Sequence, residues 1–275
     1  MNEDMKRTPD CLELAGSWVK HVHDSVTGED DAARQSMFTL FKAGSTYSAA
    51  DLMQFVSDTW GGNIQYGGRS ELCAQIVALK SETFENQLKG FAKITGEAGN
   101  DPLGGITSTK IDFNSSGRQW TWQVCTQVGW LMTASKNSVL TTDLTGLDYQ
   151  LKTCERVFGV KLNPKDYIDE LNDVLMGDIE MRGSNIFFTN GQNDGWQWAG
   201  MRSIENKNSS MYAHVVKCDN CAHCVDLYTE SKDDSEDLVN TRIEIRKHVA
   251  TWLKGEGFPE DSEEHRRRLL KWITK

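Results

Sequence analysis

The sequence has no run of apolar residues long enough to cross a membrane. A membrane helix needs roughly 18–20 consecutive apolar residues, and no stretch of the 275 residues approaches that length. The first ten residues, MNEDMKRTPD, also lack the apolar core that a secretory signal requires. We therefore expect no membrane partner and no signal peptide in this chain, which is either not exported or without its true N-terminus.

Positive charge is also scarce. The chain has 30 Lys and Arg against 40 Asp and Glu, which gives a formal net charge of −10. Proteins that bind a phosphate backbone neutralise it with clustered Lys and Arg. The acidic balance therefore argues against a nucleic acid as a partner. With 38% hydrophobic residues and 9 Trp, the chain has enough apolar surface for a substantial core.

The first hundred residues have the pattern of consecutive helices. Leu14, Trp18 and Val22 recur at a spacing of four, which places one apolar stripe along a helix. Ser48 followed three residues later by Asp51 resembles a capping box at the start of another helix. This region is therefore predicted to be helical, with short connections.

A change in composition comes next. Gly, Pro, Asn and Ser accumulate at 96–118, where the helical period is lost. The stretch is either a loop or a domain boundary.

Tryptophans cluster directly beyond this stretch, in RQWTWQVCTQVGW. If this segment is extended, Trp120 and Trp122 lie on the same side of it. Two interpretations stay open: an aromatic cluster within the core, or the aromatic wall of an apolar substrate pocket.

Two short apolar segments farther along are each followed by a polar loop. SNIFFTNG precedes the loop with Asp194, and MYAHVVKC precedes the loop CDNCAHC with His223. The first segment is apolar on both faces, which is typical of a buried parallel strand. An amphipathic helix at 235–254 comes after them. Catalytic groups of α/β sheets lie on loops after strands, and α/β-hydrolases order their triad Ser, Asp, His along the chain. Asp194 and His223 stand where the second and third members belong.

The two loops resemble those of the serine peptidase family of prolyl carboxypeptidase, dipeptidyl peptidase II and thymus-specific serine protease. That family's Asp loop reads Asn-Gly-x-x-Asp-Pro-Trp, and this chain has NGQNDGW at 190–196. The resemblance implies that Asp194 is the catalytic aspartate. It also makes Trp196 a candidate for the substrate pocket, together with Trp120 and Trp122. Gly195 stands where the family has proline.

The family's His loop reads Gly-Ala-His-His-x-Asp-Leu, and this chain has CAHCVDL at 221–227. The resemblance implies that His223 is the catalytic histidine. Cys221 replaces a glycine, and Cys224 replaces the second, non-catalytic histidine. The tryptophan segment is similar to the family's Trp-x-x-Gln-x-Cys-Thr-Glu, with Gln127 in place of the glutamate, and NIQYGGRSELC also resembles a family element.

This resemblance implies an α/β fold, namely an incomplete α/β-hydrolase core at 116–275 with a helical cap, or insertion, domain at 1–115. It implies a serine-type exopeptidase, either a carboxypeptidase or a dipeptidyl peptidase, which acts on short peptides without a cofactor. It further implies disulfides between Cys11 and Cys73 and between Cys125 and Cys154. Such bridges would place the parent protein in a lysosomal or secretory compartment.

The clustered cysteines leave an alternative. Cys218, Cys221 and Cys224 are spaced as metal ligands often are, and His214 or His223 could complete a zinc site. A metal-bound His223 could not also act as a base, so the two interpretations exclude each other. The peptidase interpretation predicts no metal.

The nucleophile has no counterpart in the sequence. No Gly-x-Ser-x-Gly pentapeptide occurs, and GGRSEL at 67–72 fails at the last glycine. In the family this elbow precedes the helical insertion, so we expect the half that bears the serine to be missing. A parallel sheet reduced to its last two or three strands would expose an unpaired edge. Such an edge would favour a homodimer or association with the missing half. The runner-up hypotheses are an inactive truncated homologue and a Cys-rich metal-binding protein.

Overall fold

The computed structural model describes residues 2–44, 46–97, 109–159, 161, 183–204 and 210–255. The chain separates into two compact units, Met1–Gly177 and Asp178–Lys275. Among the described residues, no helix is both long and apolar enough to cross a bilayer.

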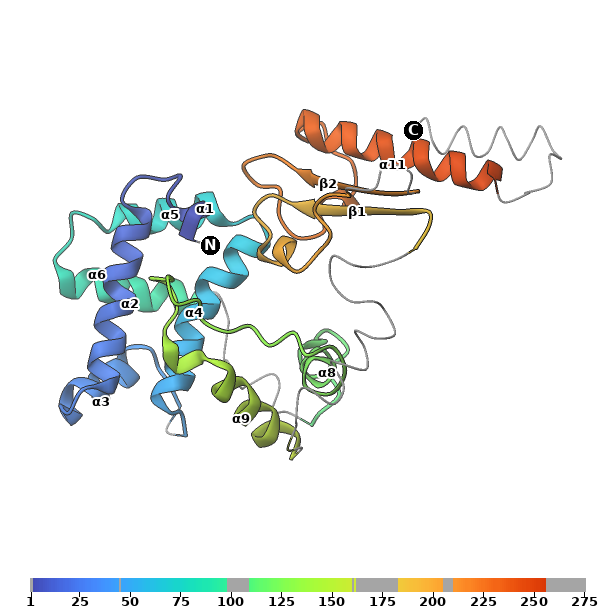
Figure 1. Cartoon of the computed structure of the whole chain (residues 1–275). Coiled ribbons are helices and arrows are strands. Elements are labelled where there is room, and N and C mark those ends of the chain that lie inside the picture. Colours follow the sequence, from blue (N-terminus) through green and yellow to red (C-terminus); the bar gives the residue numbers. More distant parts are fainter. Residues whose placement is uncertain are drawn as a thin grey trace. The chain divides into compact units, whose positions relative to one another are not determined.

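The first unit is helical, as Figure 1 shows. The α-helices among its described residues are α1 (Asn2–Met5), α2 (Cys11–Thr27), α3 (Asp31–Leu40), α4 (Ala49–Gln65), α5 (Arg69–Ala78), α6 (Phe84–Glu97), α8 (Gly117–Gln123) and α9 (Leu147–Phe158). A π-helical turn, η1 (Val124–Val128), continues α8, and a 3-10 turn, η2 (Asp143–Thr145), precedes α9.

The core of this unit is built on stacked aromatic rings. The Phe91 ring of α6 lies 5.4 Å from that of Trp18 on α2 and 5.3 Å from that of Trp60 on α4. All three side chains are fully buried, and aromatic burial is among the largest single contributions to a core. A disulfide between Cys11 and Cys73 joins α2 to α5.

A buried carboxylate fixes α9 against α4. Asp51 completes the capping box with Ser48, as the sequence predicted, and it also accepts hydrogen bonds from Tyr149 and from both terminal nitrogens of Arg156. Burial acts to raise the pKa of Asp51, but the bonds from Arg156 and Ser48 outweigh it, so the pKa is lowered. The carboxylate therefore stays ionised and paired, and one residue both completes the capping box of α4 and joins α4 to α9.

Burial dominates the ionisation of a second carboxylate of α4. It raises the pKa of Asp58 to about 6, although Gln54 donates a hydrogen bond to this carboxylate at 2.7 Å. Because the folded state holds this proton more tightly than the unfolded chain, the cost of ionising Asp58 is absent below about pH 4 and is complete above about pH 6.

Replacing Asp58 by asparagine is therefore expected to stabilise the unit by up to about 3 kcal/mol at pH 7 and to have little effect near pH 4. Urea unfolding, followed by the fluorescence of the buried Trp18 and Trp60, would measure the difference. Asp148→Asn, at an exposed position of α9, is the control. An equal gain at both pH values would contradict the assignment.

The described part of the second unit contains two parallel strands and one long helix. Strand β1 (Ile186–Gly191) pairs with β2 (Met211–Val216) in register from Ile186 opposite Met211 to Gly191 opposite Val216. Figure 1 shows α11 (Glu236–Gly255) running along this sheet. Both strands and the helix were predicted, but β1 is only half-buried for most of its length. It does not have the full burial on both faces that its apolar sequence suggests.

The tryptophan segment is helical, and the extended interpretation is wrong. Trp120 and Trp122 lie on α8, where two residues apart means different sides of the helix. Both side chains are exposed, at 47% and 43%, so they do not form a core cluster. The disulfide between Cys125 and Cys154 ties η1 to α9.

The division of the described chain into units falls at residue 177, whereas the predicted domain boundary lies at 115. Helices α8 and α9, which the sequence assigned to the second domain, belong to the first compact unit. The assignment of 1–115 to a cap and of 116–275 to a hydrolase core stays a prediction.

Candidate active site

Two loops meet beyond the carboxyl ends of β1 and β2. Because the strands are parallel neighbours, both loops leave the sheet at the same edge. The first loop leads into a 3-10 turn, η4 (Gly195–Trp198), whose N-cap is Asp194. The second carries His223 and leads into another 3-10 turn, η5 (Val225–Leu227).

The side chains of Asp194 and His223 are in contact. Nδ1 of His223 lies 2.7 Å from Oδ2 of Asp194, while Oδ1 of Asp194 accepts a hydrogen bond from the Trp196 backbone N–H at 3.0 Å. Asp194 is buried, and His223 is about one-third exposed. One carboxylate oxygen thus anchors the aspartate to its own turn, and the other contacts Nδ1 and so orients the imidazole ring.

Backbone contacts hold the two loops together. The Asn193 N–H donates to the carbonyl of Cys221 at 2.7 Å, and its side-chain amide donates to the carbonyl of Asp219. Asn193 is almost completely buried, at 1% exposure. A Cβ added to Gly191 would lie only 2.2 Å from the carbonyl oxygen of Ala222. Only glycine fits there, because the two backbones approach each other closely.

The His loop is also fixed to α11. The buried guanidinium of Arg242 donates to the backbone carbonyls of Val225, Asp226 and Tyr228, and Thr189 on β1 donates to the carboxylate of Asp226 at 2.9 Å. Neither Asn193 nor Arg242 was predicted from the sequence. Asn193 lies within the family motif but at one of its variable positions. Arg242 gave no signal because, apart from the carboxylate of Asp234, its partners are backbone carbonyls, which every residue has.

A second His–Asp pair lies on the sheet. Nε2 of His214 on β2 is 3.1 Å from each carboxylate oxygen of Asp237 on α11, and the Lys217 N–H also donates to Asp237 at 2.6 Å. Burial acts to raise the pKa of Asp237, but the hydrogen bonds from Lys217 and His214 lower it overall. His214 thus joins the strand to the helix and is not brought into a site with the clustered cysteines.

The clustered cysteines do not form a set of three thiolates. Cys218 and Cys221 form a disulfide, and Cys224 is an exposed free thiol. Bridged sulfurs cannot act as thiolate ligands, which disfavours the metal-binding alternative. The other two bridges are those that the family resemblance implies, with Cα atoms 5.3 and 5.8 Å apart.

The three candidate pocket tryptophans fall on different units. Trp196 lies in η4, two residues after Asp194. Trp122 lines a cleft of about 1030 Å³ in the first unit, together with Arg118, Gln127 and Phe158. The ring of Trp122 packs edge-on against Phe158 at 5.2 Å. Trp120 does not line this cleft.

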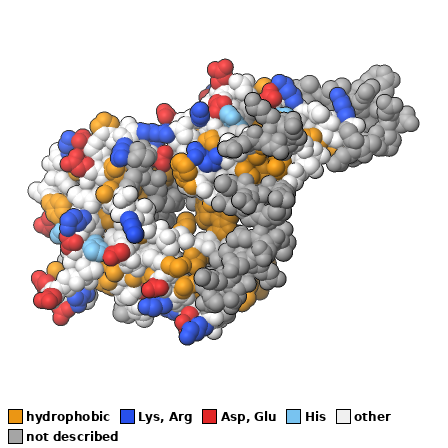
Figure 2. Space-filling view, viewed as in Figure 1, with side chains coloured by type: hydrophobic (Ala, Val, Ile, Leu, Met, Phe, Trp, Pro, Cys, Tyr) orange, Lys and Arg blue, Asp and Glu red, His pale blue; other side chains and the backbone are white. Residues whose placement is uncertain are grey.

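Acidic and basic side chains are interspersed on the face shown in Figure 2, where the described residues form no continuous basic field. The site consists of a carboxylate that orients an imidazole, both on loops after parallel strands. This is the geometry that a histidine base and its orienting carboxylate require.

Comparison with known proteins gives the family. Residues 38–245 match the family described as serine carboxypeptidase S28, so the chain belongs to that family. Membership implies an α/β-hydrolase-like fold, in keeping with the parallel strands that precede the two loops.

Two relatives, one from a plant and one from human, show how much of each chain the similarity covers. The chain is 26% identical over 235 residues to the Arabidopsis thaliana protein named "Probable serine protease EDA2", which covers 78% of this chain and 47% of that protein. It is 29% identical over 153 residues to human thymus-specific serine protease, which covers 54% of this chain and 28% of that protein. The chain thus spans about half the length of the first relative and less than a third of the second.

Gly195 stands where the family's Asp loop has proline, and a proline at this position is expected to stabilise the folded protein. Asp194 before it has φ −74° and ψ 123°, the extended conformation that a following proline requires. Gly195 is also the first residue of a turn, where proline is well tolerated. Gly195→Pro is expected to raise the free energy of unfolding by about 0.4–1 kcal/mol through the unfolded chain. Thermal unfolding would measure this, and a loss of stability would contradict it.

Proposed function

We propose that this chain supplies the acid–base pair of a serine-type exopeptidase, which cleaves short peptides through an acyl-enzyme. The observation that carries the proposal is the 2.7 Å contact between Asp194 and His223 on loops after parallel strands. In this role Nε2 of His223 takes the proton of a nucleophilic serine and later gives it to the leaving amine. Asp194 holds the ring tautomer and stabilises the imidazolium.

Burial supports the role of Asp194. Its carboxylate is 8% exposed, and both of its oxygens have donors of this unit. An aspartate fixed in this way needs no reorganisation when the imidazole becomes charged, and this lowers the barrier of the proton-transfer step. His223 is more exposed, as a residue that must reach a substrate has to be.

The nucleophile and the oxyanion donors are assigned to no residue of this sequence. We propose that they come from polypeptide that bears the family's Gly-x-Ser-x-Gly elbow, and that Trp196, two residues after Asp194, lines the substrate pocket. The choice between carboxypeptidase and dipeptidyl peptidase depends on that shared pocket. The disulfides support a lysosomal or secretory compartment for the protein.

Labelling with a fluorophosphonate probe tests the proposal. Residues 1–275 alone are expected to give no labelling, because their sequence holds no Gly-x-Ser-x-Gly elbow. Co-expression with a family segment that bears the elbow is expected to give labelling on the added serine and turnover of prolyl dipeptide substrates. Labelling of a serine within 1–275 that His223→Ala abolishes would show that the nucleophile is misplaced. A well-formed complex without labelling or turnover would favour an inactive homologue.

A further inference from the structure

The third disulfide differs from the other two in the loop that it closes. Cys11 and Cys73 are 62 residues apart, and Cys125 and Cys154 are 29 apart, whereas Cys218 and Cys221 are only 3 apart. A bridge restricts the unfolded chain more when its loop is longer. The short bridge therefore contributes least to global stability, and its effect must be local.

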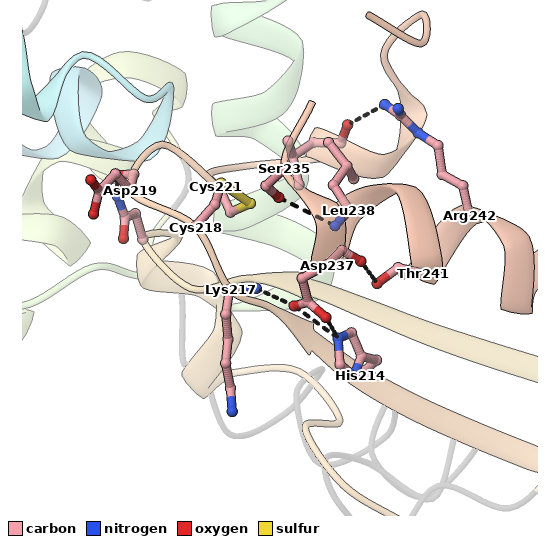
Figure 3. Close-up of a disulfide and its surroundings, with 12 residues drawn as sticks. His214, Lys217, Cys218, Asp219, Cys221, Ser235, Asp237, Leu238, Thr241 and Arg242 are labelled. Carbon is pink, nitrogen blue, oxygen red and sulfur yellow. Dashed lines mark hydrogen bonds and ion pairs between the residues drawn. A yellow bond between two sulfur atoms is a disulfide. The ribbon is translucent and has the colours of Figure 1, made fainter. Parts of the chain in front are cut away.

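Its local effect falls on both members of the acid–base pair. The bridge closes the turn 218–221, and the carbonyls of Asp219 and Cys221 in this turn accept hydrogen bonds from the side-chain amide and the backbone N–H of Asn193. Asn193 directly precedes Asp194, and Cys221 comes two residues before His223. Figure 3 shows the bridge within this turn, with Asp219 beside it. The turn is thus the common support of the two loops.

The short bridge is also the most accessible of the three. Its Cys218 is half-buried, although Cys221 is fully buried. The four cysteines of the other two bridges are all at 2% exposure or less. Thiol–disulfide exchange requires that a thiolate reach a sulfur atom. A reductant should therefore open the 218–221 bridge before the others.

We propose that the Cys218–Cys221 disulfide is a thiol–disulfide exchange site for a dithiol, and that its opening releases the contact between Asp194 and His223. The inference rests on the proposed function only for the consequence that opening lowers catalysis. The structural event requires nothing beyond this unit.

The exchange has two steps. A thiolate of the dithiol attacks Sγ of Cys218, the Cys218–Cys221 bond breaks, and the electron pair leaves on Cys221, which takes a proton. The second thiolate of the reagent then attacks the reagent sulfur that is bound to Cys218, and Cys218 leaves as a thiolate and is protonated. The reagent is oxidised to a cyclic disulfide, and the protein gains two thiols.

The ionisation of the third cysteine, Cys224, bears on why the Cys218–Cys221 bridge persists beside a free thiol. Burial raises the pKa of Cys224, and the charges of Asp226 and Asp194 raise it further. The thiol form therefore predominates at neutral pH, and the thiol is a poor nucleophile. Cys224 is therefore a weak nucleophile toward the bridge, and the attacking reagent in this proposal is an external dithiol.

The test uses the full chain and graded dithiothreitol, with two readouts. Peptide mapping after alkylation gives the order in which the bridges open. Proton NMR of ¹⁵N-histidine-labelled protein follows the His223 Nδ1–H proton that is hydrogen-bonded to Asp194, with His23 of the first unit as an internal reference. Cys224→Ser keeps the bridge and is the matched control for Cys218→Ser/Cys224→Ser, which cannot form it.

We expect 218 and 221 to be alkylated first, and the His223 signal to be lost at the same concentration while His23 is unchanged. The double variant should lack the signal without reductant, and Cys224→Ser should behave as the parent. If the double variant does not fold, the titration of the parent decides alone. Persistence of the signal after selective opening, or earlier opening of another bridge, would overturn the proposal. Neither readout needs peptidase activity, so the result is independent of the proposed function.

Discussion

Replacing His223 by glutamine, in a complex made active by a segment that bears the serine, is expected to lower kcat/KM by about 10⁴-fold or more. Glutamine has a similar reach and can still hydrogen-bond to Asp194, but its amide cannot accept the serine proton. The loss should therefore fall on the chemical step and leave folding intact. Steady-state hydrolysis of a prolyl dipeptide substrate measures it, with circular dichroism as the check on structure.

The second His–Asp pair provides a matched control. His214 lies in the same unit and contacts Asp237 through Nε2, but it lies on the face of the sheet and not on a loop. His214→Gln should change stability more than kcat. If His214→Gln and His223→Gln lowered kcat equally, or if His223→Gln kept more than about a tenth of the activity, the assignment of the base would be wrong.

The sequence was most informative where a local pattern determines the structure. The helical repeat around Trp18, the capping box of Ser48 and the two short strands depend on residues near one another in the chain, and all are present. The positions of Asp194 and His223 were predicted from motif and strand order, because parallel neighbouring strands bring their loops together.

The sequence was less informative where a contact joins distant segments. The spacing of Trp120 and Trp122 fits a strand as well as an exposed helix, and the segment is the helix α8, followed directly by η1, which is bridged from Cys125 to Cys154 on α9. Likewise, Arg156 has no motif that would announce its pairing with Asp51, 105 residues earlier. Tertiary contacts of this kind override local preference.

Replacing Gly191 by alanine is expected to separate the two loops and to destabilise the second unit by about 3 kcal/mol or more. The added Cβ would lie 2.2 Å from the carbonyl oxygen of Ala222 and 2.7 Å from that of Cys221, and both are backbone atoms that cannot rotate away. Displacing these carbonyls also breaks the hydrogen bond from Asn193 to Cys221. The contact between Asp194 and His223 should therefore be lost even where the unit still folds.

Gly195→Ala is the matched control for Gly191→Ala, because a Cβ at that position of the same loop meets nothing within 4 Å. Denaturant unfolding followed by the fluorescence of Trp196, together with the His223 Nδ1–H proton signal, would compare the two variants. Gly195→Ala should keep both the stability and the signal, and Gly191→Ala should lose both. If Gly191→Ala retained the signal, the close approach of the two backbones would not be what positions the pair, and the contact would have to depend on the side chains of Asp194 and His223 alone.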